Sequence, residues 1–402
     1  MPAASPLPRA PSVLTLSSAA DLLTERGCPV CRYAAEAADR YLVWFALEAH
    51  ADSVMITRLG VSLGMCARHT RGLMSQPGAA ARLTAAYQYI LQAAQARLAG
   101  RTHRPAACPG CAHDQAAATR ALGTLLEGLE EPGVQARCRD VGGLCVPHAH
   151  AAALVRRQRH AAAWLVQVTI DSLHGSPRPL AVLAGGPDHD AAVRARLRAR
   201  LPPPGHAPSA AACRVCAAAA CQERDQLTPL DLAGSLAWAS ACLCPRHLRD
   251  AALTAPDDSA GLLTSQARQQ AARLAAAARG KPLVPGWRRR LAGECPVCQA
   301  CEAAAQRELR DLADMPAGPG AADWPGMLCV RHVLALRPAG SPAARAAAAL
   351  AARRADALAA ELAAAFRKGT WAHRHEPKGR EATAWQRAAV FLDGGVCGGT
   401  PA

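Results

Sequence analysis

The chain has 402 residues, more than one typical core contains, so its length predicts two or more domains. Hydrophobic residues make up 51% of it but aromatic residues only 3%, which excludes a large aromatic core. Ala-rich helices bury little area per residue, so the composition favours a fold that bound metal helps to stabilise.

The first 18 residues contain four prolines and no continuous apolar stretch, so they predict a disordered leader rather than a signal peptide. No run of about 18 uncharged apolar residues follows, which argues against a membrane span. Unpaired thiols at metal-ligand spacing favour a reducing compartment. These features together predict a cytoplasmic protein without membrane contact.

A Cys-x-x-Cys motif at residues 28–31 is followed by a Cys-x-x-His motif at 66–69, and this order recurs three times. The later copies are 108–111 with 145–148, 213–216 with 244–247, and 295–298 with 329–332. With 17 Cys and 14 His, chance gives only about 0.7 Cys-x-x-Cys and about 0.6 Cys-x-x-His motifs. The strict alternation therefore indicates a repeated structural unit.

Three thiolates and one imidazole form a closed tetrahedral ligand set that suits Zn²⁺ and leaves no position for water. The sequence thus predicts four structural zinc sites, each joining a Cys-x-x-Cys to the next Cys-x-x-His. The predicted ligands are Cys28, Cys31, Cys66, His69, Cys108, Cys111, Cys145, His148, Cys213, Cys216, Cys244, His247, Cys295, Cys298, Cys329 and His332. Disulfides, buried thiols, iron and iron–sulfur clusters remain alternatives.

Four modules follow from this pattern, with boundaries at 19–100, 101–174, 213–280 and 281–402, the last including a C-terminal segment. A Pro- and Gly-rich linker at 175–212, with a short helix expected near 190–201, separates two halves of two modules each. The third module departs most from the pattern, because no Pro follows its first Cys and its internal interval is the shortest.

We call each Cys-x-x-Cys or Cys-x-x-His motif a half-site. Apolar residues at helical spacing follow every half-site, so we expect an all-α fold of four helical modules, each held together by a metal ion. Clear examples are the stretches 33–50, 79–98 and 342–366. Because both motifs directly precede such stretches, each metal is expected to join the start of one helix to the start of another. The positive end of a helix favours nearby thiolates.

Five cysteines remain outside the predicted sites: Cys138, Cys221, Cys242, Cys301 and Cys397. Cys221 and Cys301 are candidates for reactive thiols, although a buried structural role is the simpler interpretation. Near the C-terminus, His373, His375, Glu376 and Glu381 gather close to two tryptophans. They predict either a fifth, open metal or anion site or a polar segment that packs on the last module.

The unit Cys-Pro-x-Cys, an acidic amphipathic helix and Gly-x-Cys-x-x-His resembles a bacterial family of uncharacterised cysteine-rich proteins. The second module matches it best, in the motif at 108–111, the helix break at 130–133 and Gly143 to His148. The final segment, 366–385, is also similar to the end of that family. The resemblance implies a metal-binding, mainly helical protein and no particular reaction.

The sequence is compatible with three classes of function. A non-enzymatic scaffold or adaptor that binds a protein partner fits repeated small modules best. Nucleic-acid binding is the alternative, because the net charge of +15, about +11 with four filled sites, accompanies arginine clusters at 156–159, 194–200 and 288–290. Few aromatic residues are available to stack on bases, so we expect such binding to be weak. A thiol redox or metal-handling role is the second alternative.

Overall fold

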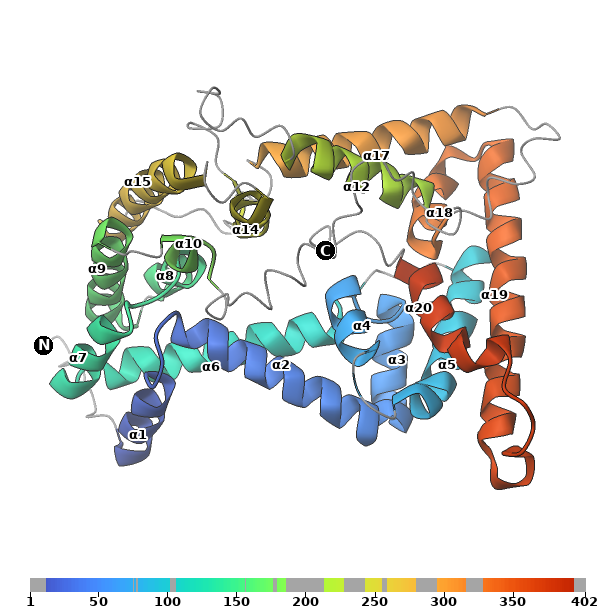
Figure 1. Ribbon diagram of the computed structural model, residues 1–402, viewed down its shortest axis with the longest axis horizontal. Coiled ribbons are helices and arrows are strands. Elements are labelled where there is room, and N and C mark those ends of the chain that lie inside the picture. The colour runs from blue at the N-terminus through green and yellow to red at the C-terminus, as the bar shows by residue number, and fades with distance from the viewer. Residues whose placement is uncertain are drawn as a thin grey trace, which may run out of the picture. The chain divides into compact units, whose positions relative to one another are not determined.

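The computed structural model describes residues 12–74, 76, 79–101, 106–155, 157–175, 179–185, 213–227, 243–254, 259–279, 295–315 and 328–393. Within these ranges the chain forms α-helices and short 3-10 turns and no strand, so the predicted all-α fold is confirmed (Figure 1). Of the predicted leader at 1–18, residues 1–11 lie outside the described residues, as do the expected helix at 190–201 and the arginines at 288–290. Residues 13–18 of that leader are helical, because they form the first part of α1 (Val13–Leu22), so disorder is not what the structure shows there.

The helices cluster into two compact units, each assembled from three segments of the chain. Unit 1 takes Met1–Glu36, Gln115–Leu201 and Leu227–Pro296, and unit 2 takes Ala37–Asp114, Pro202–Gln226 and Val297–Ala402. Each unit therefore combines segments from before and after the linker. This grouping differs from the sequence-order modules, whose boundaries follow the chain from one half-site to the next.

Unit 1 packs two long helices, α9 and α15, against each other. Its helices are α1 (Val13–Leu22), the start of α2 (Pro29–Leu47), most of α6 (Pro109–Gly128), α7 (Pro132–Asp140), α8 (Val146–Ala153), α9 (Arg159–Gly175), α10 (Pro179–Ala184), α14 (Pro245–Thr254) and α15 (Ser259–Ala278). On α9, Leu165, Val166 and Leu173 recur at helical spacing and are buried. On α15, Leu262 and Leu274 are buried in the same way.

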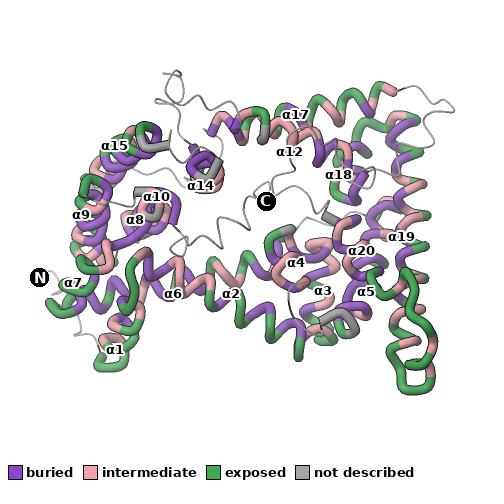
Figure 2. Tube along the Cα trace, viewed as in Figure 1, coloured by how far each residue is buried: buried purple, intermediate pink, exposed green. Residues whose placement is uncertain are grey.

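Unit 2 is organised around α5 and α19, which lie side by side over much of their length (Figure 1). It contains the rest of α2, the start of α6, α3 (Ser53–Ser62), α4 (Ala67–Met74), α5 (Ala79–Leu98), α12 (Arg214–Leu227), α17 (Pro296–Asp314), α18 (Val330–Leu336), α19 (Pro342–Gly369) and α20 (Ala384–Asp393). Figure 2 shows buried positions recurring along both long helices. They include Leu83 and Ile90 on α5 and Ala347 and Ala355 on α19.

Small residues on α19 allow this close packing. Its buried positions are mostly alanines, which have no side chain beyond Cβ, so the larger residues of α5 fill the space between the helices. Phe391 and Trp385 of α20 complete the same core. The predicted stripes on 33–50 and 79–98 are confirmed except at Trp44, which is 43% exposed.

Candidate metal centres

The structure places all sixteen predicted ligands in four clusters, but it pairs the motifs differently from the prediction. Site A is Cys28, Cys31, Cys145 and His148; site B is Cys66, His69, Cys108 and Cys111; site C is Cys213, Cys216, Cys329 and His332; site D is Cys244, His247, Cys295 and Cys298. Each Cys-x-x-Cys was expected to join the next Cys-x-x-His. That pairing was wrong, because the outer motifs of each half pair with each other and enclose the inner pair.

Helix length explains the correction. α2 starts at the first Cys-x-x-Cys and carries the chain about 28 Å away over its 19 residues. The following α3 has 10 residues and is only about 15 Å long, too short to reverse the full length of α2, and Cys66 and His69 cluster with the second Cys-x-x-Cys instead. α6 then starts at the second Cys-x-x-Cys, beside these two residues, and runs about 30 Å before the chain reaches Cys145.

The first cysteine of every half-site lies directly before a helix, as predicted. Pro29, Pro109 and Pro296 open α2, α6 and α17, where proline is favoured because its missing N–H has no helical partner. Cys145 and Cys329 are the N-cap residues of α8 and α18, and their carbonyls accept the first helical hydrogen bonds. Each cluster therefore joins two helix starts, whose partial positive charge stabilises thiolates.

The distances within the clusters fit one tetrahedral ion. A regular tetrahedron with metal–sulfur bonds of about 2.3 Å separates its sulfurs by about 3.8 Å. The Sγ atoms of Cys31 and Cys145 are 3.5 Å apart, and those of Cys66 and Cys111 are 3.7 Å apart. The histidine Nδ1 atoms lie 3.2 to 3.6 Å from the ligand sulfurs. In every cluster the ligand atoms lie within 4.8 Å of one another.

The electrostatics of these clusters also favour a cation. Hydrogen bonds to Cys145 and Cys28 hold the pKa of Cys31 well below its ordinary value, whereas burial raises the pKa of both of those partners. At site B, burial opposes protonation of His69, but hydrogen bonds to Asp114 and to the site's own thiols raise its pKa to about 11. Burial thus keeps some of these thiols protonated, whereas a divalent ion would stabilise all three thiolates of a cluster at once.

Gly185 is a component of site A that the sequence pattern did not indicate. It follows α10 with a φ of +68°, and a Cβ atom there would lie 2.8 Å from the Cys145 Sγ and 2.9 Å from the Cys31 Sγ. Its carbonyl accepts a 3.2 Å hydrogen bond from Arg249 of α14. Only glycine combines this backbone conformation with so close an approach to the two sulfurs.

Site B differs from the others in its surroundings. Asp114 accepts a hydrogen bond from the Nε2 of His69 at 3.1 Å and also pairs with Arg68, so Nδ1 of the imidazole faces the thiolates. A carboxylate in this position fixes the orientation of a ligand histidine. Cys111 is the exposed one among the sixteen ligands. Site B is accordingly the cluster most open to solvent.

Gly110, inside the Cys-Pro-Gly-Cys motif, has the ring of His69 where a side chain would be. A Cβ at this position would lie 2.7 Å from His69 Cγ. We expect Gly110→Ala to displace the imidazole and to weaken metal binding at site B about tenfold or more, measured by competition with a chromophoric chelator. Gly123→Ala is the matched control, because it lies in the same helix with no atom within 4 Å of the added Cβ.

The control should bind metal normally and gain up to about 1 kcal/mol of stability from its better helix propensity. Equal metal affinity in both variants would contradict the role given to Gly110.

The third module is not an isolated degenerate unit. Its Cys213 and Cys216 belong to site C, and its Cys244 and His247 belong to site D. Three of the four ligands are buried in each of these sites. The cysteines 242 and 397 lie outside the described residues.

The remaining described cysteines belong to no cluster. Cys138 is fully buried in α7, and burial raises the pKa of its thiol to about 12, so it stays protonated at neutral pH. Cys221 and Cys301 are half-buried thiols on α12 and α17. No disulfide forms among the cysteines that the structure describes. These residues therefore offer no preformed redox pair within the described ranges.

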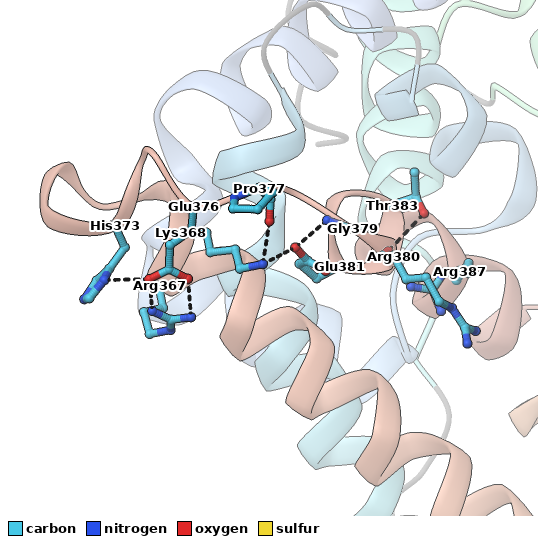
Figure 3. Close-up of polar contacts among 10 residues, drawn as sticks. All are labelled: Arg367, Lys368, His373, Glu376, Pro377, Gly379, Arg380, Glu381, Thr383 and Arg387. Carbon is cyan, nitrogen blue, oxygen red and sulfur yellow. Dashed lines mark hydrogen bonds and ion pairs between the residues drawn. The ribbon is translucent and has the colours of Figure 1, made fainter.

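His373, Glu376 and Glu381 form ion pairs rather than a metal cluster within the described ranges (Figure 3). His375 accepts a 3.3 Å hydrogen bond from Arg374. Glu376 accepts two hydrogen bonds from Arg367, at 2.5 and 2.6 Å, and a third from Nδ1 of His373 at 2.9 Å. Glu381 binds Lys368 at 2.8 Å, which lowers the pKa of Glu381 to about 2. Of the two interpretations of this segment, the polar segment tied to the end of α19 agrees with these contacts.

Comparison of the chain with protein-family models, curated proteins and solved structures gives no match. The fold and the four clusters define a cysteine-rich, all-helical protein with four sites that can hold a metal ion. The similarity to the bacterial cysteine-rich family rests on the motifs alone. Among the described helices, none has the length and apolar character needed to cross a membrane.

Proposed function

We propose that this protein is a non-enzymatic scaffold that binds four zinc ions and presents helical surfaces to a protein partner. The observation that carries the proposal is the set of four Cys₃His clusters, each of which joins the starts of two helices. Ligand atoms within 4.8 Å of one another leave room for a single ion rather than for a polynuclear cluster. A closed Cys₃His tetrahedron is typical of structural zinc and leaves no position for a substrate.

An exposed apolar surface at the end of α2 and the start of α3, here the α2–α3 strip, supports a protein partner. Val43 and Trp44 lie one helical turn before Leu47, and the three are 39%, 43% and 47% exposed; Val54 is 58% exposed. Exposed large apolar residues gathered in one place mark interaction sites more often than single ones do. Trp is also enriched in the centres of protein interfaces.

Trp44→Ser with Leu47→Ser tests the strip in the full chain, purified with its partners from the cells that produce it. Tyr89→Ser is the matched control, because Tyr89 is 52% exposed on α5 and lies outside the strip as defined. We expect both proteins to retain four zinc ions and the same thermal transition. Only the double variant should lose a stoichiometric protein partner. Retention of that partner by the double variant would exclude the strip. A folded protein that contains no zinc in elemental analysis would exclude the structural role of the metal.

Nucleic-acid binding is the second candidate, and one observation favours it. Arg157 and Arg159 are exposed at the start of α9, while Arg156 and the clusters at 194–200 and 288–290 lie outside the described residues. Replacing Arg156, Arg157 and Arg159 with Gln should flatten the salt dependence of binding if they contact phosphates. Submicromolar binding at physiological salt that is lost in this variant, with four zincs retained, would place nucleic acid ahead of a protein partner.

A thiol redox or metal-handling role is the remaining alternative, with Cys221, Cys301 and the exposed ligand Cys111 as its candidate residues. A cytoplasmic location belongs to the main proposal, because thiolate ligands persist in a reducing compartment.

A further inference from the structure

The two halves of the chain, residues 19–185 and 213–393, use the same order of half-sites. In the first half, the outer motifs form site A and the inner motifs form site B. In the second half, the outer motifs form site C and the inner motifs form site D. The same nested pairing thus occurs twice, once on each side of the linker.

The helices that follow corresponding half-sites also correspond. α5 and α15 each follow an inner Cys-x-x-His and each have 20 residues. α9 and α19 each follow an outer Cys-x-x-His, and each is in turn followed by a short helix, α10 or α20. The halves therefore repeat not only the ligands but the sequence of long and short helices between them.

The long helices pack across the halves in a reciprocal way. In unit 2, α5 of the first half packs on α19 of the second, and in unit 1, α15 of the second half packs on α9 of the first. The shorter elements follow the same rule, since α4 contacts α20 and α14 contacts α10. Such reciprocity, in which element i meets j and j meets i, characterises a two-fold dimer interface.

Polar contacts between the halves occur in both units. In unit 2, Arg337 donates a 2.8 Å hydrogen bond to the carbonyl of Arg97, and Gln95 donates one of 2.5 Å to Asp356. In unit 1, Arg249 donates to the carbonyl of Gly185 beside site A. The second half thus completes the surroundings of a metal cluster whose ligands all belong to the first half.

The apolar face of α15 shows how much depends on the other half. It packs against α8, α9 and α10, all of which belong to the first half. Ala271 and Leu274 on this helix are buried, and so are the glutamine side chains of Gln266 and Gln270. Without the first half, this face would have to meet water or another chain.

We propose that the two halves bind each other as the subunits of a dimer do, and that the linker only keeps them together. The interaction surface of each half is its pair of long helices with the adjoining short helix, and the partner it fits is the other half. This inference rests on helix pairing and holds whichever protein or nucleic acid the whole chain binds.

A cleavage experiment on the full chain tests the proposal. A recognition sequence for a site-specific protease is inserted between Gly205 and His206, within the predicted linker, and the metal-loaded protein is cut. We expect one particle that contains both fragments in equal amounts and the complete set of metals, seen by native mass spectrometry and light scattering. Two separate particles with two metals each at micromolar concentration would overturn the proposal.

Paired variants locate the interface. Ala355→Glu on α19 and Ala271→Glu on α15 place a carboxylate at positions that are 0% and 3% exposed, whereas Ala357→Glu and Ala272→Glu are exposed controls on the same two helices. In the cut protein, each buried variant should weaken association of the fragments by about tenfold or more, because a buried unpaired charge is costly. Equal effects of buried and exposed variants would contradict the reciprocal interface. If a variant fails to fold, cleavage of the protein that carries the recognition sequence without any Glu substitution still tests the proposal.

Discussion

Removal of the metal by a strong chelator at neutral pH is expected to abolish the cooperative thermal transition of the full chain and most of its helical circular dichroism. Each cluster fixes two helix starts that come from distant parts of the sequence. The core between the helices is rich in alanine, so it supplies little stabilisation once the clusters are lost. A structural zinc site contributes about 10–16 kcal/mol of apparent binding free energy in small zinc-dependent domains.

Adding zinc back after the chelator is removed should restore both signals, and adding magnesium should not, because thiolates bind magnesium poorly. An unchanged melting temperature after complete removal of metal, established by elemental analysis of the same sample, would contradict a structural role for the clusters.

Gly185→Ala is expected to have the largest effect of any single substitution outside the ligands. The added Cβ would meet the sulfurs of Cys145 and Cys31 at 2.8 and 2.9 Å, and neither sulfur can move while it holds a metal. The positive φ adds about 1–2 kcal/mol of backbone strain. We therefore expect loss of the metal from site A and a clear fall in the urea midpoint of unfolding.

Gly340→Ala is the matched control for this variant. Gly340 has a similar φ of +61°, but nothing lies within 4 Å of its added Cβ. The control should show the strain alone and retain the complete set of metals. An equal fall in the urea midpoint and an equal number of metals per chain in the two variants would show that the contact between Cβ and the sulfurs has no effect.

Spacing in the sequence was sufficient to predict which sixteen residues form the clusters and where the helices after the motifs start, although it missed the helix α1 within the predicted leader. Cys-x-x-Cys and Cys-x-x-His place two ligands on one turn, and the apolar residues after them recur with helical period. α5 begins and ends where the periodicity places it, at Ala79 and Leu98. The pairing was not predictable in the same way, because motif spacing specifies a half-site but not its partner.

The partner of a half-site depends on where whole helices carry the chain. More than 100 residues lie between Cys31 and Cys145 in the sequence, and the directions of all the intervening helices bring the two together without a local signal that indicates it. Signals for neighbouring residues were weaker still. Gly185 lies in a Pro- and Gly-rich linker, where the sequence gives no reason to single out one glycine. Asp114 follows Cys111 by three residues on a helix surface, where any polar residue is compatible with the pattern.

The nested pairing is tested most directly by counting metals in variants that lack two half-sites. One variant removes the first and fourth half-sites, with Cys28→Ser, Cys31→Ser, Cys145→Ser and His148→Ala; the other removes the first and second, with Cys28→Ser, Cys31→Ser, Cys66→Ser and His69→Ala. Both lose four ligands, so a general loss of stability affects them alike. Nested pairing predicts three metals per chain in the first variant and two in the second, by native mass spectrometry. Two in the first and three in the second would contradict it and restore the pairing of each Cys-x-x-Cys with its nearest Cys-x-x-His.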